Sequence, residues 1–225
     1  MAKDEPNTLV LGGTGLVGTE FLKLSSSSTL VKPLVWARTE PKPPFPFQQI
    51  TWGDVQSGKA SIPKSIHSIV CCLGTTIRKA GSQDAFREID FGYPVAVGKV
   101  AKNAGVKNYL VVSALGSDKD SLVFYNRVKG ELEKELVSFR FPFLGVFRPS
   151  LLLGDRNEFR PGEKVAEVVS SIFPFGLFGL QRYQPIPAKN VARAMLNTLE
   201  NRLRQNENSI TVEYFESERI QEIGK

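Results

Sequence analysis

The chain has 225 residues, of which 41% are hydrophobic and 23% are charged, and its formal net charge is +6 at pH 7. These proportions are ordinary for a soluble globular protein, and the length allows one large α/β domain or two small ones. The lysines and arginines are scattered, so nucleic acid is not an expected partner. Cys71 and Cys72 are adjacent and His67 is the single histidine, which argues against a disulfide framework and against a metal site.

No apolar segment is long enough to span a bilayer, and residues 1–6 do not resemble a signal peptide. We therefore expect no transmembrane segment and a cytoplasmic location. No internal repeat or linker divides the sequence, so residues 1–225 are expected to form a single domain.

Residues 8–11 form an apolar run typical of a strand, and closely spaced glycines follow it, directly before a predicted helix that includes residues 19–24. In a dinucleotide turn, one glycine permits the tight reversal, a second lets the backbone approach a pyrophosphate, and a third lets the helix pack on its strand. The pyrophosphate then lies at the free N–H groups of that helix. Both Gly12/Gly15/Gly18 and Gly13/Gly15/Gly18 fit. The expected cofactor-binding residues of this turn are Gly12, Gly13, Thr14, Gly15, Leu16, Val17 and Gly18.

A second predicted strand, residues 31–37, ends at Arg38, the position where such a fold meets the adenosine ribose. An acidic residue there accepts a hydrogen bond from the 2′-hydroxyl of NAD, whereas an arginine suits the 2′-phosphate of NADP. The nearest carboxylate, Glu40, lies two residues after Arg38, so the position itself holds an arginine and favours NADP(H). The alternative is a solvated loop arginine.

The proline-rich residues 40–47 connect to a short predicted strand at 48–52. Asp54 follows it, either as a contact to the adenine edge or as an ordinary turn aspartate. A fourth predicted strand at 68–73 is apolar enough to be buried on both faces. It ends in a loop of small residues, Gly74 and Thr75, where the backbone is expected to pass close to the cofactor.

The rest of the chain continues the alternation of helices and strands. A long helix begins near Ser82 or Asp84, runs past Pro94 and ends at Gly105. The other predicted elements are strands at 108–113, 143–147 and 210–213, helices that begin at 125 and span 165–173 and 191–203, and a short final helix. This alternation predicts a doubly wound, mostly parallel sheet, which is the Rossmann fold.

Tyr125 and Lys129 lie four residues apart, so they share one face of the predicted helix. A nearby ammonium favours the phenolate form of a tyrosine, which suits Tyr125 for exchanging a proton with a substrate hydroxyl or carbonyl during hydride transfer. Ser113, at the end of the fifth predicted strand, is expected to bond the same substrate oxygen, with Ser117 as a rival. The alternative to these catalytic roles is a structural one for each residue. Tyr125 would pack partly in the core, Lys129 would be solvated, and Ser113 would cap the end of the strand.

These motifs resemble the short-chain dehydrogenase/reductase superfamily, and more narrowly its atypical members in the Tat-interacting oxidoreductase-like subgroup. The resemblance runs nearly end to end. Besides the glycine turn it includes residues 71–76, 125–131, 148–156 and 160–163.

The resemblance implies one NADP(H)-binding Rossmann domain with Tyr125 as proton donor or acceptor and Lys129 on the nicotinamide ribose. It also implies cofactor contacts from Arg38, Leu73, Leu152 and Arg160. Two departures stand out. Ser150 occupies a position where the family usually has glycine, and the pair of serines common after the fifth strand is reduced to Ser113-Ala114.

From about residue 150 onward, the chain is expected to form a small cap on the substrate side. The loop 150–163 is typical of a mobile segment over a site. The phenylalanine-rich residues 173–180 are a candidate for core packing, for the lining of a hydrophobic substrate pocket, or for contact with a protein partner or a membrane surface.

The sequence therefore favours an NADP(H)-dependent oxidoreductase that acts on a carbonyl or alcohol substrate with an apolar part. The alternative is an NADPH-binding regulatory or scaffold protein with little turnover. A nucleotide-sugar epimerase is a weaker hypothesis, because the sequence after residue 150 is short for a substrate domain of that kind.

Overall fold

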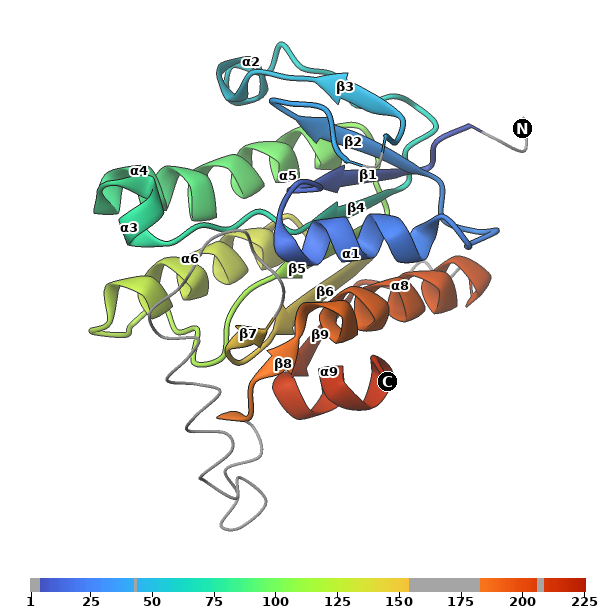
Figure 1. Cartoon of the computed structure of the whole chain (residues 1–225). Coiled ribbons are helices and arrows are strands. Elements are labelled where there is room, and N and C mark those ends of the chain that lie inside the picture. Colours follow the sequence, from blue (N-terminus) through green and yellow to red (C-terminus); the bar gives the residue numbers. More distant parts are fainter. Residues whose placement is uncertain (1–4, 43, 154–182, 206–208) are drawn as a thin grey trace.

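The computed structural model describes residues 5–42, 44–153, 183–205 and 209–225 (Figure 1). Its central element is a seven-stranded sheet in the order β3-β2-β1-β4-β5-β6-β9, in which every neighbouring pair is parallel. The strands are β1 (Thr8–Leu11), β2 (Pro33–Ala37), β3 (Phe47–Gln49), β4 (Ser68–Cys71), β5 (Asn108–Val112), β6 (Phe143–Arg148) and β9 (Thr211–Glu216). The predicted doubly wound parallel sheet is confirmed.

Helices cover both faces of this sheet (Figure 1). One face carries α1 (Leu16–Ser25), α8 (Ala188–Gln205) and α9 (Ser217–Ile223), and the other carries α2 (Trp52–Gln56), α5 (Tyr93–Asn103) and α6 (Phe124–Ser138). The remaining elements are α3 (Ile77–Ala80), α4 (Gln83–Arg87), a π-helix η1 (Glu88–Gly92), and a separate two-stranded pair, β7 (Leu152–Leu153) and β8 (Ile186–Pro187).

The central strands are buried on both faces because successive side chains point to opposite helical layers. Val10 of β1 packs with the layer of α1 and α8, whereas its neighbours Leu9 and Leu11 pack with the layer of α5 and α6. Val10 is in register with Val35 and Val70 on the adjacent strands, so the apolar set extends across the sheet.

Two predicted elements differ in the structure. The strand expected at 48–52 ends at Gln49, and Trp52 begins α2 instead, because the Thr51 hydroxyl accepts a hydrogen bond from the Asp54 backbone N–H and caps that helix. The long helix expected from Ser82 to Gly105 is divided into α4, η1 and α5. Pro94 lies in the first turn of α5, directly after η1, and it has no N–H to continue the α-helical hydrogen bonds of the preceding turn.

The last strand runs parallel to β6 along its whole length, and the rings of Phe147 and Phe215 stack at 4.5 Å across this pair. The helix predicted at 191–203 is present as the longer α8, and the final short helix is α9. The helix predicted at 165–173 and most of the predicted cap lie outside the described residues.

Candidate active site

The glycine turn connects β1 to α1 and lies against the end of β4. Gly12 has φ of +74°, and a Cβ atom there would lie 2.6 Å from the carbonyl carbon and oxygen of Cys72. A Cβ atom on Gly18 would lie 2.1 Å from the Gly12 carbonyl oxygen. Neighbouring backbone atoms therefore leave no room for a side chain at either position. These contacts favour the Gly12/Gly15/Gly18 register, since Gly13 contacts only side chains of the layer below.

The N-terminal end of α1 is open on the side of this turn. Gly15 is the N-cap residue, and it has no side chain that could cap the first N–H groups of the helix. Thr14 and Gly15 are exposed, whereas Leu16 is half-buried and Val17 is buried. Uncapped N–H groups beside glycines are the arrangement that binds a pyrophosphate, so the residues present fit a dinucleotide.

Arg38 is exposed directly after the end of β2, and its carbonyl accepts a hydrogen bond from Gln49 Nε2 at 3.2 Å. A stacked aromatic pair lies close by, with the rings of Trp52 and Tyr93 4.4 Å apart and 8° from parallel. Burial and the Glu88 carboxylate raise the pKa of Tyr93, and the Arg38 guanidinium opposes this shift. The charge of Arg38 therefore acts on Tyr93 of the aromatic pair.

Asp54 is part of the α2 cap rather than a free carboxylate. Its Oδ2 accepts a hydrogen bond from the Thr51 hydroxyl at 2.6 Å, and its N–H donates to the same hydroxyl oxygen. This geometry favours the turn role of Asp54, and its contact with adenine stays a prediction.

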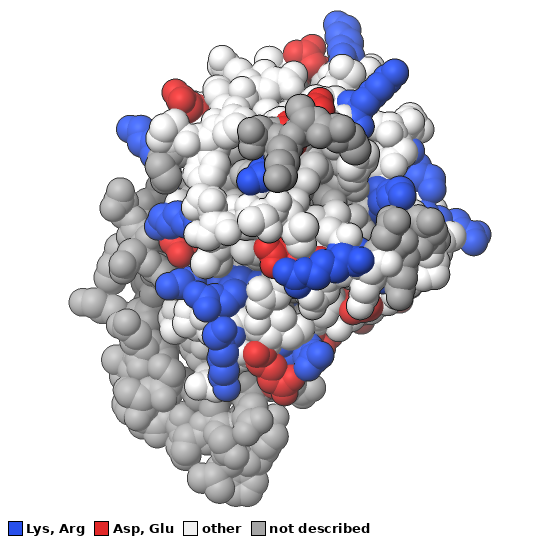
Figure 2. Space-filling model, turned by 90° about the vertical axis from the view of Figure 1, so that its right-hand side faces the viewer, with Lys and Arg blue, Asp and Glu red and all other residues white. Residues whose placement is uncertain are grey.

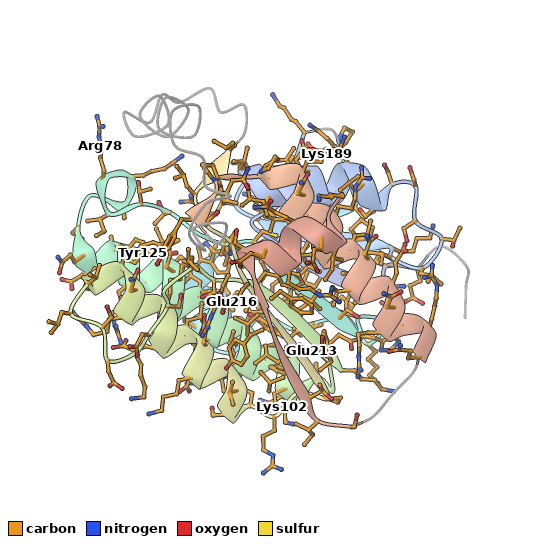
Figure 3. All side chains as sticks on the ribbon, turned by 90° about the horizontal axis from the view of Figure 1, so that it is seen from below. Arg78, Lys102, Tyr125, Lys189, Glu213 and Glu216 are labelled. Carbon is orange, nitrogen blue, oxygen red and sulfur yellow. The ribbon has the colours of Figure 1, made fainter. Side chains whose placement is uncertain are left out.

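Tyr125 and Lys129 lie one turn apart at the start of α6. Tyr125 is labelled in Figure 3. Tyr125 is half-buried, and its ring lies 5.5 Å from that of Phe86. Lys129 is buried, and its Nζ lies 2.7 Å from Asp90 Oδ1. Burial acts to lower the pKa of Lys129, but the Asp90 carboxylate and, to a smaller extent, Tyr125 raise it above its ordinary value.

Asp90 is a site residue that the sequence reasoning missed. It lies in η1, and its Oδ2 accepts a hydrogen bond from the Thr75 backbone N–H at 2.8 Å. A signal was present, because Asp90 follows the buried Phe86 by four residues and precedes the buried Val97 by seven, so it lies on the core face of the predicted helix. An acidic side chain on such a face requires a partner.

Ser113 is buried at the end of β5, and its hydroxyl bonds the Glu133 carboxylate and, at 3.0 Å, the Ser117 hydroxyl. Glu133 in turn pairs with Arg148, which also pairs with Glu216. The described contacts of Ser113 lie in this network, so its role beside Tyr125 stays a prediction.

The other predicted cofactor residues follow β4 or lie from β7 onward. Leu73, Gly74 and Thr75 follow β4 and lie beside the glycine turn, since the Leu73 nitrogen would be 2.8 Å from a Cβ atom on Gly12. Leu152 is in β7, which pairs with β8. The hydroxyl of Ser150, the departure noted above, bonds the Gln184 carbonyl and Ser217. Arg160 and the phenylalanine-rich stretch 173–180 lie outside the described residues.

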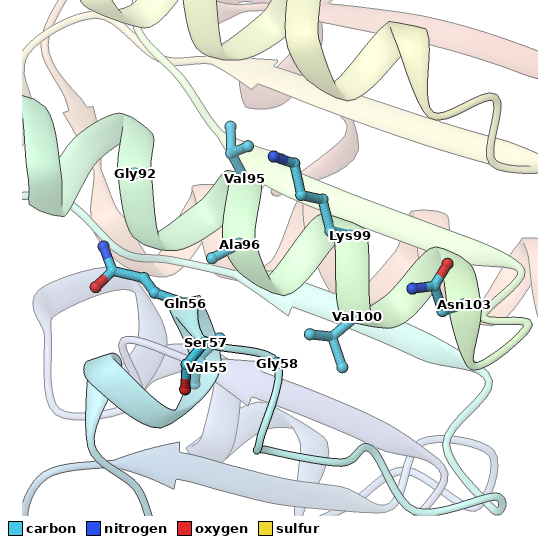
Figure 4. Close-up of a pocket in the computed structure, with 10 residues that line it drawn as sticks. All are labelled: Val55, Gln56, Ser57, Gly58, Gly92, Val95, Ala96, Lys99, Val100 and Asn103. Carbon is cyan, nitrogen blue, oxygen red and sulfur yellow. The ribbon is translucent and has the colours of Figure 1, made fainter.

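Two surface features lie apart from this site. A cavity of about 470 Å³ opens between α2 and α5, and no predicted site residue lines it (Figure 4). On the face shown in Figure 2, basic side chains are dispersed among uncharged and acidic ones.

Within the part of the chain that the structure describes, no helix is both long and apolar enough to cross a membrane.

The parallel sheet, its crossover helices and the glycine turn define a Rossmann fold. Solved structures share it: MoeE5 in complex with UDP-glucose and NAD matches with a TM-score of 0.64 over 93% of this chain and 76% of that chain, at 14% identity. The UDP-Glc/GlcNAc 4-epimerase from Campylobacter jejuni matches with a TM-score of 0.67 over 97% and 82%, also at 14% identity. At this identity the likeness extends to the fold alone.

Sequence relatives define the family more narrowly, although no family model matches the chain. Protein HTATIP2 from Rattus norvegicus is 39% identical over 155 residues, 69% of this chain but only 60% of the rat protein. Protein FMP52-1, mitochondrial, from Scheffersomyces stipitis is 35% identical over 67% of this chain and 69% of its own length. FMP52 from Lodderomyces elongisporus is 30% identical over 87% of both. The chain belongs to the family that contains FMP52 and HTATIP2, which confirms the predicted resemblance to the Tat-interacting oxidoreductase-like subgroup.

The expected cytoplasmic location is wrong. The FMP52 relatives from Debaryomyces hansenii, Scheffersomyces stipitis, Lodderomyces elongisporus and Candida albicans are all named as mitochondrial proteins. The expectation depended on the lack of a secretory signal, which does not exclude an organelle.

Proposed function

We propose that the protein is an NADP(H)-dependent oxidoreductase that transfers hydride between the nicotinamide and a carbonyl or alcohol substrate. The observation that carries this proposal is the chain of contacts from Tyr125 and Lys129 to the glycine turn. Lys129 pairs with Asp90, Asp90 accepts from the backbone of Thr75, and the loop of Thr75 lies against Gly12. The proton-transferring pair and the dinucleotide cradle thus share one edge of the sheet, where open α/β folds bind ligands.

The residues that would hold the cofactor follow from this edge. The pyrophosphate would lie on the N–H groups at the start of α1, and Gly74 and Thr75 would line its path. Arg38 would pair with a 2′-phosphate, with Trp52 and Tyr93 as the neighbouring aromatic surface. Solved structures that share the fold are complexes with NAD, so the proposed preference for NADP depends on Arg38.

The bound cofactor would supply or accept the hydride. The Tyr125 hydroxyl would donate a proton to the substrate oxygen during reduction and accept one during oxidation. Lys129 would bind the nicotinamide ribose and place a positive charge near the phenol. The fixed backbone of the loop after β4 would orient the nicotinamide half, because Asp90 holds Thr75.

The test is a fluorescence titration of the purified protein with NADPH and with NADH, followed by a screen of carbonyl substrates of increasing apolar size. We expect NADPH to bind about ten- to a hundredfold more tightly, the range for loss of a charge-assisted hydrogen bond. Tyr125→Phe should abolish reduction but leave NADPH binding intact. Failure to bind either nucleotide would refute the proposal.

A second candidate is an NADPH-binding regulatory or scaffold protein. The observation that favours it is the engagement of the Ser113 hydroxyl by Glu133, which removes one expected bond to the substrate oxygen. A partner that binds only the NADPH-loaded form, together with no turnover across the carbonyl panel, would support this role over the enzyme.

The names of the yeast relatives also lead us to infer a mitochondrial association for this protein. Subcellular fractionation with a tagged full-length chain tests it. Recovery outside the mitochondrial fraction would refute the inference.

A further inference from the structure

The least expected feature of the site is a buried ion pair. The side chains of Asp90 and Lys129 are 1% and 3% exposed, and their charged atoms lie 2.7 Å apart. Removal of two charges from water is costly, and a pair of apolar residues would often be at least as stable. The presence of this pair beside Tyr125 therefore calls for a reason other than stability.

Asp90 connects two elements that the proposed function needs to hold together. Its Oδ1 faces Lys129 on α6, and its Oδ2 accepts from the Thr75 N–H in the loop after β4. The same Oδ1 lies 3.6 Å from the position of a Cβ atom on Gly74. The π-helical turn η1 places the carboxylate here, and such turns occur often at functional sites.

The other charges around Lys129 do not replace this carboxylate. Cys71 from β4 and Tyr125 from α6 itself are the further titratable groups that act on its ammonium. On the more exposed side of α6, Glu131 pairs with Arg87 of α4. Glu133, one helical turn after Lys129, pairs with Arg148.

We propose that Asp90 is a positioning residue that keeps Lys129 protonated and fixed between Tyr125 and the cofactor loop. The role rests on the proposed function, since it concerns the residue expected to bind the nicotinamide ribose. An unpaired lysine in a buried site loses its proton readily, and a neutral amine would neither bind the ribose as a cation nor act on the Tyr125 phenol.

The decisive variant is Asp90→Asn, which removes the charge but retains an oxygen acceptor for the Thr75 N–H. Lysine side-chain NMR of the full-length protein without cofactor follows the ionisation of Lys129, whose signal is assigned from Lys129→Arg. In the wild type, the pKa of Lys129 should lie above the ordinary lysine value, whereas in Asp90→Asn, where burial acts without the carboxylate, it should fall below that value. Asp84→Asn, an exposed carboxylate on α4, is the matched control and should change nothing.

Function gives a second readout. NADPH affinity and turnover of Asp90→Asn should fall as the pH rises through the lowered pKa of Lys129, a loss that neither the wild type nor Asp84→Asn shows at the same pH. An unchanged Lys129 titration in folded Asp90→Asn would overturn the proposal. Absence of NADPH binding in the wild type would instead refute the proposed function, and the NMR titration would still decide the role of Asp90.

A double variant without either charge is the control for the folding of Asp90→Asn. If Asp90→Asn does not fold because an ammonium is left unpaired, the double variant Asp90→Asn/Lys129→Gln should recover a cooperative thermal transition. Failure of the double variant to recover would also overturn the proposal, because the folding defect would then not come from an unpaired ammonium.

Discussion

Gly18→Ala tests whether the close packing of α1 on the glycine turn is required. The added methyl group would lie 2.1 Å from the Gly12 carbonyl oxygen and 2.9 Å from the Gly13 Cα atom, both of them backbone atoms that cannot rotate away. Such overpacking costs about 3 kcal/mol, and the better helix propensity of alanine returns about 1 kcal/mol. The net loss of about 2 kcal/mol should lower Tm by about 4–8 °C for a chain of this size.

Thermal unfolding followed by circular dichroism measures this loss, with Gly53→Ala in α2 as the control. A Cβ atom on Gly53 meets nothing nearer than the Thr51 hydroxyl at 4.0 Å, so its Tm should not fall. Displacement of α1 should also weaken NADPH binding by about tenfold or more, since the N–H groups at its start would move with it. A Gly18→Ala protein with wild-type Tm and NADPH affinity would refute the packing argument.

Three further predictions follow from charges and burial. Arg38→Ala should weaken NADPH binding by about ten- to a hundredfold but leave NADH binding unchanged in the fluorescence titration, and equal losses for both would contradict the 2′-phosphate role. Arg148→Met leaves the buried Glu133 without its cation and should lower the free energy of unfolding in urea by about 3 kcal/mol. Glu216→Gln, at a side chain that is 43% exposed, should lower it by less than about 1 kcal/mol. Similar losses for the two variants would refute this ranking. Burial raises the pKa of Cys71 from 9.0 to about 11, so the folded thiol keeps a proton that the unfolded thiol has lost, and stability should fall across this pH range. Cys71→Ala should show a shallower fall in unfolding experiments repeated at each pH, and an equally steep one would contradict the cause.

The parts of the fold that depend on local pattern were predictable from sequence. The apolar runs of β1 and β4 are long enough to show strands buried on both faces, and the alternation with helices indicates a parallel sheet. The start of α2 was missed because a single Thr51 cap outweighs the strand character of Trp52. The π-turn before Pro94 was missed because its spacing closely resembles that of an α-helix.

The site divides in the same way. Tyr125 and Lys129 are neighbours on one helix, so their spacing was enough to pair them. The glycine register was not decidable, because it depends on the close approach of Gly12 to Cys72, which directly follows the distant strand β4. The partner of Lys129 is on another helix, and a sequence pattern does not reveal an ion pair between distant segments.

The position of β9 at the edge of the sheet has a consequence for biosynthesis. β6 emerges from the ribosome long before residues 211–216, and until then its outer edge has no strand to pair with. That edge belongs to a segment rich in phenylalanine and β-branched or aliphatic residues, Phe143–Arg148, of the kind that recruits other chains when left open. Until β9 is made, the strands from β3 to β5 can already pair while the outer edge of β6 stays open, and pairing with β9 is what covers that edge.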